Sequence, residues 1–223
     1  MSHPTERRAD EPTLKITEIF FSLQGEARDV GWPTVFVRLT GCPLRCGYCD
    51  TAYAFHGGET KTIADILHEV GRYKAHRVCV TGGEPLAQKN CLVLLKQLCD
   101  AGYEVSLETS GALDVSAVDP RVIKVMDIKT PGSGEEARNR WANIDALTAQ
   151  DQVKFVLADR ADYDWAKRQV AERTLHQKAD ILFSPVFGGM TAKELAEWIL
   201  EDQLPVRMQI QLHKYIWGDE PGH

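Results

Sequence analysis

The sequence lacks a long hydrophobic run: no stretch approaches the ~18 consecutive apolar residues that a membrane-spanning helix requires. Its first 13 residues are polar and charged, unlike the apolar core of a secretory signal sequence. Both absences argue against a membrane partner and against export. We therefore expect a cytoplasmic protein.

Positive charge is not concentrated in blocks either. No run of Lys and Arg is longer than Arg7-Arg8, and 26 basic against 32 acidic side chains give a net charge of −6. This balance carries no electrostatic footprint for nucleic acid, so a small-molecule partner is expected. The 223 residues also show no internal repeat, low-complexity tract or linker. We expect a single domain over 1–223 with a flexible tail at 1–13.

Short apolar runs alternate with amphipathic segments along most of the chain, a pattern typical of parallel βαβ units. The sequence predicts fewer helices than strands, and it predicts no helix between Leu107 and Val122. The sequence therefore predicts an α/β fold, a partial (β/α) barrel of about six parallel strands plus an N-terminal extension strand. Predicted strands are Leu14–Leu23, Thr34–Thr40, Arg77–Val80, Glu104–Leu107, Val122–Ile128, Val153–Leu157, Asp180–Phe183 and Arg207–Leu212; predicted helices are Ile63–Tyr73, Cys91–Ala101, Tyr163–His176 and Ala192–Glu201, with a long loop over Cys42–Lys61.

The six cysteines form two groups. Cys79, Cys91 and Cys99 are scattered among apolar neighbours and are interpreted as buried small side chains. The other three crowd into one loop, close enough to meet at one metal centre, and three thiolates on an iron–sulfur cluster would leave one iron open. A zinc site completed by a histidine such as His56 is the alternative; a disulfide would leave one thiol over. The loop thiols are Cys42, Cys46 and Cys49.

The spacing Cys-x₃-Cys-x₂-Cys, with Tyr48 before the last cysteine, resembles the signature of the radical S-adenosylmethionine (SAM) enzymes. Thr81-Gly82-Gly83-Glu84-Pro85 is similar to that family's second motif, whose glycines approach the methionine amino group. The resemblance implies a [4Fe-4S] cluster on the three cysteines and SAM on its fourth iron, with a 5′-deoxyadenosyl radical rather than a side chain as the reactive group. It implies SAM contacts at Tyr48, Cys49, Asp50, Gly83, Glu84, Glu108, Ser110, Asp127, Lys129, Ser184, Pro185 and Val186; for the weaker matches at Glu108–Gly111 and Asp127–Lys129 an ordinary turn is the alternative.

The N-terminal third is similar to the 7-carboxy-7-deazaguanine synthases of queuosine precursor biosynthesis, through Glu18–Glu26, Gly31–Pro33 and Val35–Cys42, and the likeness extends to Gln211–Tyr215. This resemblance implies rearrangement of 6-carboxy-5,6,7,8-tetrahydropterin to 7-carboxy-7-deazaguanine with loss of ammonia. It also implies Mg²⁺ on Thr51, a flavodoxin or ferredoxin as electron donor, and a homodimer. Implied substrate contacts are Leu23, Gln24, Gly25, Glu26, Arg38, Thr81 and His213.

Arg38 is also singled out by strand periodicity. Alternation along Thr34–Thr40 places it on the face opposite Val35, Val37 and Leu39, so its guanidinium would point inward. A buried arginine requires an anionic partner, and a substrate carboxylate fits its planar fork. Pairing with a structural carboxylate such as Glu26 is the alternative.

Two departures from the synthase pattern affect local geometry. Ala27 stands where glycine commonly follows the Gln-Gly-Glu segment, and the tail Gly218–His223 is polar and irregular, so no contact is assigned to His223. Two other functions compete with a synthase: a glycyl-radical-enzyme activating protein, which would act on a protein partner, and a non-catalytic zinc-binding module.

Overall fold

A computed structural model describes residues 11–218, 220 and 222. Residues 1–10 of the predicted flexible tail lie outside the described part of the chain, and Thr13, the last residue of the predicted tail, begins the first strand. The strands form one sheet in the order β3-β1-β2-β4-β5-β6-β7-β8-β9. They are β1 (Thr13–Leu23), β2 (Pro33–Leu39), β3 (Glu59–Thr62), β4 (Arg77–Gly82), β5 (Glu104–Thr109), β6 (Ile123–Ile128), β7 (Gln152–Leu157), β8 (Asp180–Pro185) and β9 (Arg207–Met208).

From β2 to β9 the neighbouring strands all pair in parallel, whereas β1 runs antiparallel to β2 and to β3. Strands β3 and β9 form the two edges, so the sheet does not close. The prediction of an α/β partial barrel with an N-terminal extension strand is therefore confirmed. Seven strands pair in parallel, against about six expected, and the last of them, β9, is the short remainder of the predicted strand Arg207–Leu212.

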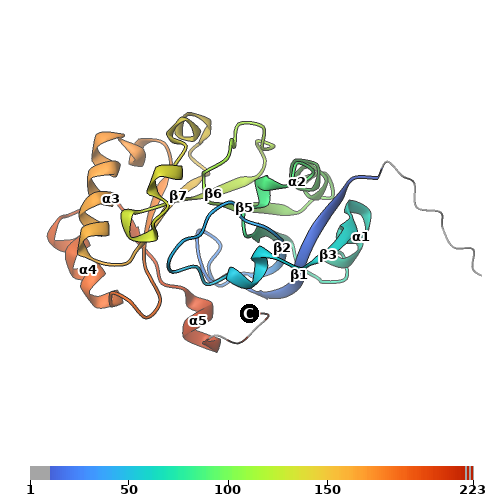
Figure 1. Cartoon of the computed structure of the whole chain (residues 1–223), viewed down its shortest axis with the longest axis horizontal. Coiled ribbons are helices and arrows are strands. Elements are labelled where there is room, and N and C mark those ends of the chain that lie inside the picture. The colour runs from blue at the N-terminus through green and yellow to red at the C-terminus, as the bar shows by residue number, and fades with distance from the viewer. Residues whose placement is uncertain (1–10, 219, 221, 223) are drawn as a thin grey trace, which may run out of the picture.

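Four helices lie on the outside of the curved sheet, α1 and α2 towards the β1–β5 end and α3 and α4 beyond β7, whereas α5 lies apart from them near the C-terminus (Figure 1). Local signals define their starts: Thr62 caps α1, Asp159 caps α3, and Thr191 with Glu194 forms a capping box on α4. No described helix is long and apolar enough to cross a membrane. The helices are α1 (Ile63–Val70), α2 (Cys91–Asp100), α3 (Arg160–Glu172), α4 (Ala192–Glu201) and α5 (Leu212–Trp217).

Strand alternation divides the sheet into an apolar outer face and an inner face that carries the charged side chains. On β2, Val35, Val37 and Leu39 are fully buried in a core shared with α1 and α2. On β7, Val153 and Phe155 belong to a second core, shared with α3 and α4. The intervening residues point to the concave side, where the strand ends converge.

The sequence prediction differs from the structure mainly at the sheet edges. Strand β3 was predicted as loop because Glu59–Thr62 has no apolar alternation; it forms because its backbone pairs with β1. The predicted strand Arg207–Leu212 shrinks to two residues and is followed by the unpredicted α5. Here the side chains of Gln209 and Gln211 bond to the inner-face loop around Glu26 instead of continuing a strand.

Candidate functional site

A cavity of about 690 Å³ opens at the carboxyl ends of the parallel strands. Such ends are where α/β folds gather their functional side chains. The cavity brings together residues predicted on segments far apart in the sequence. The predicted residues that line it are Leu23, Gln24, Gly25, Glu26, Arg38, Cys42, Cys46, Tyr48, Cys49, Asp50, Thr51, Thr81, Gly83, Glu108, Ser110, Asp127, Lys129, Ser184, Val186 and His213.

The cluster loop, defined here as residues 42–49, presents its three thiols to this cavity. All three cysteines are half-buried and free of disulfides. Burial raises the pKa of Cys46, and the nearby Lys129 ammonium opposes that rise. A Cβ on Gly83 would collide with the Gly41 carbonyl and with Cys42. Glycine at this position therefore allows the 82–83 turn to pack closely against the start of the cluster loop.

The surroundings of these thiols differ from a preformed site for one metal ion. Among the described residues, no three His, Cys, Asp or Glu side chains converge closely enough to hold one ion. His56, the predicted fourth zinc ligand, is exposed at the end of a 3₁₀ turn. Three separated, accessible thiols with an adjacent lysine suit the larger, negatively charged iron–sulfur core, which cysteine thiolates bind.

The floor of the cavity carries a buried charge network that the sequence interpretation missed. Lys154 Nζ lies 2.8 Å from Glu26 Oε2 and 3.4 Å from Glu108 Oε2. Burial alone would lower the pKa of Lys154, but Glu108 and Glu26 raise it well above its ordinary value. Burial raises the pKa of Glu108, so one lysine and two carboxylates form a floor that can both accept and donate hydrogen bonds.

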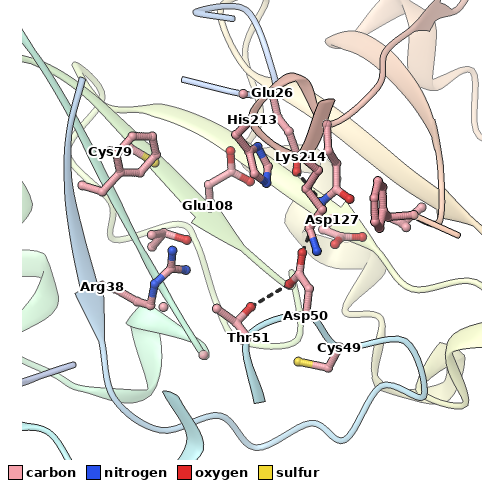
Figure 2. Close-up of a pocket in the computed structure, with 18 of the residues that line it drawn as sticks. Glu26, Arg38, Cys49, Asp50, Thr51, Cys79, Glu108, Asp127, His213 and Lys214 are labelled. Atoms are coloured by element: carbon pink, nitrogen blue, oxygen red, sulfur yellow. Dashed lines mark hydrogen bonds between the residues drawn. The ribbon is translucent and has the colours of Figure 1, made fainter. Parts of the chain in front are cut away.

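Arg38 points into the cavity, as strand alternation predicted (Figure 2). Its Nε donates to Glu18 Oε1 at 2.6 Å, and Tyr53 Oη donates to the same oxygen at 2.8 Å. Its structural partner is therefore Glu18 and not Glu26, the partner considered from sequence. The guanidinium lies 5.6 Å from the Phe20 ring and 5.7 Å from the Tyr53 ring. These contacts hold its planar group at the cavity wall.

The Gln24–Ala27 loop is held by the segment that follows β9. The Ala27 amide donates to Gln209 Oε1 at 2.8 Å, and the Leu212 amide donates to the Gly25 carbonyl at 3.0 Å. Ala27 adopts a left-handed φ of 66°, so the glycine-like backbone is retained despite the alanine. His213, the residue after Leu212, packs against Gly25 and lies beside Glu26 in the cavity (Figure 2).

Asp50 and Thr51 lie on the cavity rim, next to the cluster loop (Figure 2). Thr51 Oγ1 donates to Asp50 Oδ1 at 2.8 Å, and Gln211 Nε2 lies 3.2 Å from Asp50 Oδ2 and 2.9 Å from Glu26 Oε1. Burial would raise the pKa of Asp50, but the bonds from Thr51 and Gln211 lower it on balance. Gln211 thus connects Asp50 at the rim to Glu26 in the Gln24–Ala27 loop.

Glu84 and Pro185 do not line the cavity. The Glu84 carboxylate is fully buried and accepts hydrogen bonds from Thr109, the Ser110 amide and hydroxyl, and the Leu86 amide. Glu84 therefore shapes the turn that carries Ser110. Asp127 and Lys129 form an ion pair of 2.8 Å at the cavity wall.

Sequence reasoning missed several residues of the cavity wall. Alternation along β7 places Lys154 on the inner face beside outward Val153 and Phe155, so the argument that found Arg38 also identifies Lys154. Cys79 is buried as predicted, yet it also borders the cavity, and burial raises its pKa to about 12. Glu18, Tyr53 and Gln211 had no such local signal, because their roles come from contacts with distant segments.

The fold and the cysteine loop define a radical SAM protein, and the model of the radical SAM superfamily matches residues 36–199. The chain is 50% identical over 213 residues to 7-carboxy-7-deazaguanine synthase of Chlorobaculum tepidum, covering 94% of this chain and 97% of that protein. It is 43% identical to the protein of the same name from Koribacter versatilis, covering 93% and 98%. The crystal structure of QueE from Escherichia coli superposes with a TM-score of 0.75 at 25% identity, covering 90% and 95%. The chain therefore belongs to the radical SAM superfamily and, within it, to the family of 7-carboxy-7-deazaguanine synthases.

Proposed function

We propose that this chain is a radical SAM lyase that converts 6-carboxy-5,6,7,8-tetrahydropterin to 7-carboxy-7-deazaguanine with loss of ammonia, in queuosine and 7-deazapurine biosynthesis. The names of its relatives support this substrate and product. The observation that carries the proposal is that one cavity holds the three-cysteine loop at its rim together with Arg38, Glu26 and Glu108. A carboxylated, nitrogen-rich ring needs such a cation and such hydrogen-bonding groups in one place.

Cys42, Cys46 and Cys49 would hold the [4Fe-4S] cluster. When bound, the reduced cluster would supply one electron that cleaves SAM to methionine and a 5′-deoxyadenosyl radical, which can take a hydrogen atom from carbon. Tyr48, Gly83, Ser110 and Lys129 line the cavity that the cysteine loop borders and are our proposed SAM contacts, with Cys49, Asp50, Glu108, Asp127, Ser184 and Val186.

Arg38 would bind the substrate carboxylate. Two parallel N–H bonds fix the carboxylate in a plane, and therefore fix C6, the carbon that bears it. Glu26 would accept hydrogen bonds from the pterin amino edge. Lys154 and Gln211 each donate a hydrogen bond to the Glu26 carboxylate and so fix its orientation. Gln24, Gly25, Thr81 and His213 would complete the pocket around the ring.

The same proposal includes a Mg²⁺ ion, an electron-donor protein, a second copy of the chain and a cytoplasmic location. Thr51 would supply a side-chain oxygen to Mg²⁺, with the remaining ligands from substrate and water, because Mg²⁺ keeps several waters and takes few protein ligands. The cluster would receive its electron from a flavodoxin or ferredoxin, and a reducing cytoplasm would preserve its thiolates. We further propose a homodimer.

The direct test is product formation. Reduced, cluster-loaded protein incubated with SAM and 6-carboxytetrahydropterin is expected to yield the deazapurine, detected by its absorbance and mass. Cleavage of SAM without deazapurine would contradict the synthase assignment and favour a protein substrate instead. A preparation with one zinc and no sulfide would indicate the zinc module.

Arg38→Ala tests substrate binding within this proposal. Product formation at low substrate is expected to fall about 100-fold, because truncating one partner of a desolvated ion pair costs 2–5 kcal/mol. Iron content should stay unchanged. Arg77→Ala is the matched control: Arg77 also stacks on an aromatic ring and pairs with carboxylates, but it lies at the opposite end of β4 from the cavity. Loss of iron in Arg38→Ala alone would show a structural role.

A further inference from the structure

We propose that Asp162, on α3 outside the cavity, is a positioning residue for the cluster loop and acts through the connection between β6 and β7. This inference rests on the proposed cluster-binding role of the three cysteines. The 130–135 segment, and not the cluster loop alone, then sets the position of Cys46.

Asp162 organises the 130–135 segment, which follows β6. Its side chain is buried, and Oδ2 accepts hydrogen bonds from Thr130 Oγ1 at 2.9 Å and from the Ala158 amide at 3.0 Å. Oδ1 accepts one from the Gly132 amide at 2.8 Å. Among the described residues, no Lys or Arg pairs with this carboxylate. A buried carboxylate without a counter-charge depends on such bonds, so it fixes the donors around it.

Close packing makes this arrangement specific. A Cβ on Gly132 would collide with the Asp162 carboxylate, so the backbone approaches the acid as closely as glycine permits. The Ser133 hydroxyl donates to the Thr130 carbonyl at 2.6 Å and accepts from the Glu135 amide at 3.0 Å. Hydrogen bonds therefore hold the 130–135 segment at both ends.

This segment contacts the cluster loop on both sides of Cys46. The Gly47 amide donates to the Ser133 carbonyl at 3.0 Å, and the Arg45 amide donates to Glu135 Oε1. Tyr48 Oη also donates to the Val156 carbonyl at 3.2 Å and lies 3.4 Å from Thr130 Oγ1. Cys46 thus stands between two backbone amides that are both held by the segment that Asp162 organises.

The consequence is a rigid support for one of the three thiols. Mutating a residue that orients a metal ligand through a hydrogen bond, without touching the metal, commonly lowers metal affinity about 10–100-fold. Without Asp162, the 130–135 segment would lose its anchor, and Cys46 would sample positions away from the cluster. The cluster would then be lost faster even where the fold persists.

The test measures cluster loss in the full-length holoprotein under anaerobic conditions. Asp162→Asn replaces one acceptor oxygen by an NH₂ group, and we expect iron release to a chelator to accelerate about 10-fold, with an altered EPR line shape of the reduced cluster. Asp151→Asn is the control: Asp151 is equally buried and accepts bonds from the Lys124 and Thr148 amides, but it also pairs with the Lys124 ammonium and lies at the opposite end of β6 and β7. It should lower the melting temperature without changing iron release.

A second pair of variants covers the case in which Asp162→Asn does not fold. Glu135 is partly exposed, so Glu135→Ala should fold, and we expect it to accelerate iron release about 3-fold. Glu135→Gln keeps an acceptor oxygen and should restore the slow rate. Equal iron release in Asp162→Asn, Glu135→Ala and the Asp151→Asn control would overturn the proposal. If wild-type protein assembles no cluster, the proposed function itself fails, which is a distinguishable result.

Discussion

The two faces of the parallel strands carry opposite chemistry. On β7, outward Phe155 is fully buried among the aromatic rings of Trp165 and Phe183, while inward Lys154 pairs with two carboxylates. On β2, outward Val37 lies in the apolar core and inward Arg38 faces the cavity.

The difference shows how the fold divides its tasks. Burying apolar side chains stabilises a protein, whereas burying charges rarely does, even in pairs. The outer face therefore supplies the stability that allows the inner face to hold charges. Variants on the inner face should therefore lower activity, whereas variants on the outer face should lower stability alone.

The largest effect is expected at the cavity rim. Cys46→Ala should abolish product formation and leave far fewer than the roughly four iron atoms per chain of a complete cluster. Iron and sulfide analysis after anaerobic reconstitution measures this. Cys91→Ala is the control, because Cys91 is fully buried on α2 in the outer-face core. It should retain its iron; iron loss in both variants would undermine the division between the two cysteine groups.

Next is the charge network of the cavity floor. Lys154→Met leaves Glu26 and Glu108 buried without their cation, and we expect at least about 100-fold lower activity and about 3–5 kcal/mol lower stability at neutral pH. Lys124→Met is the matched control, since Lys124 is a buried lysine paired at 3.0 Å with Asp151 far from the cavity. It should lower stability but preserve the activity of the folded protein.

The same variant should change the pH dependence of stability. Burial raises the pKa of Glu26 and Glu108, and Lys154 is the main group that lowers it, so we expect the folded-state pKa of both carboxyls to rise in the variant. The folded state then binds more protons than the unfolded state, so stability falls as pH rises through these raised pKa values. Denaturation of Lys154→Met at several pH values should show its deficit relative to wild type shrinking towards acid. A deficit independent of pH would contradict the charge explanation.

A smaller and purely structural effect is expected on the outer face. Phe155→Ala should lower the free energy of unfolding by about 3–5 kcal/mol, from lost burial and the cavity left behind. Denaturant titration measures this change. Activity per folded molecule should remain near that of wild type. A loss of activity without loss of stability would show that the two faces are not separable.

The smallest effect concerns Ala27 on the inner side. Ala27→Gly relieves a left-handed backbone but removes a methyl group packed against Val125 and Leu182. These terms oppose each other at about 1 kcal/mol each, so the net change should stay within ~1 kcal/mol. Gly31→Ala is the control for backbone strain alone, because its φ is 84° and a Cβ there meets open space. It should destabilise by about 1–2 kcal/mol.

Local sequence patterns predicted the strands of the sheet centre and the cluster loop. Alternation on β2 located Arg38 and the outer core together, because a period of two residues follows from strand geometry alone. The three-cysteine spacing identified its loop for a similar reason: ligands close in sequence are close in space. Edge elements were predicted poorly, since β3 and β9 depend on a partner strand and not on their own side chains.

The candidate site was predicted residue by residue but not as a network. Glu84 belongs to a predicted motif, yet its buried carboxylate does not line the cavity and instead accepts hydrogen bonds from Thr109 and Ser110, which do. Gln211 was predicted as part of a strand, yet it connects Asp50 and Glu26. Both outcomes depend on which distant group lies within hydrogen-bond reach, and no local pattern contains that information.

The sequence by itself therefore determined the family, the thiol loop and the inward or outward direction of side chains on the central strands. Tertiary structure decided that Arg38 pairs with Glu18, that Lys154 joins Glu26 to Glu108, and that Asp162 supports the loop of Cys46. The physical reason is range. Strand periodicity and ligand spacing are set by neighbours along the chain, whereas each of these contacts spans 20 or more residues and exists only once the sheet has assembled.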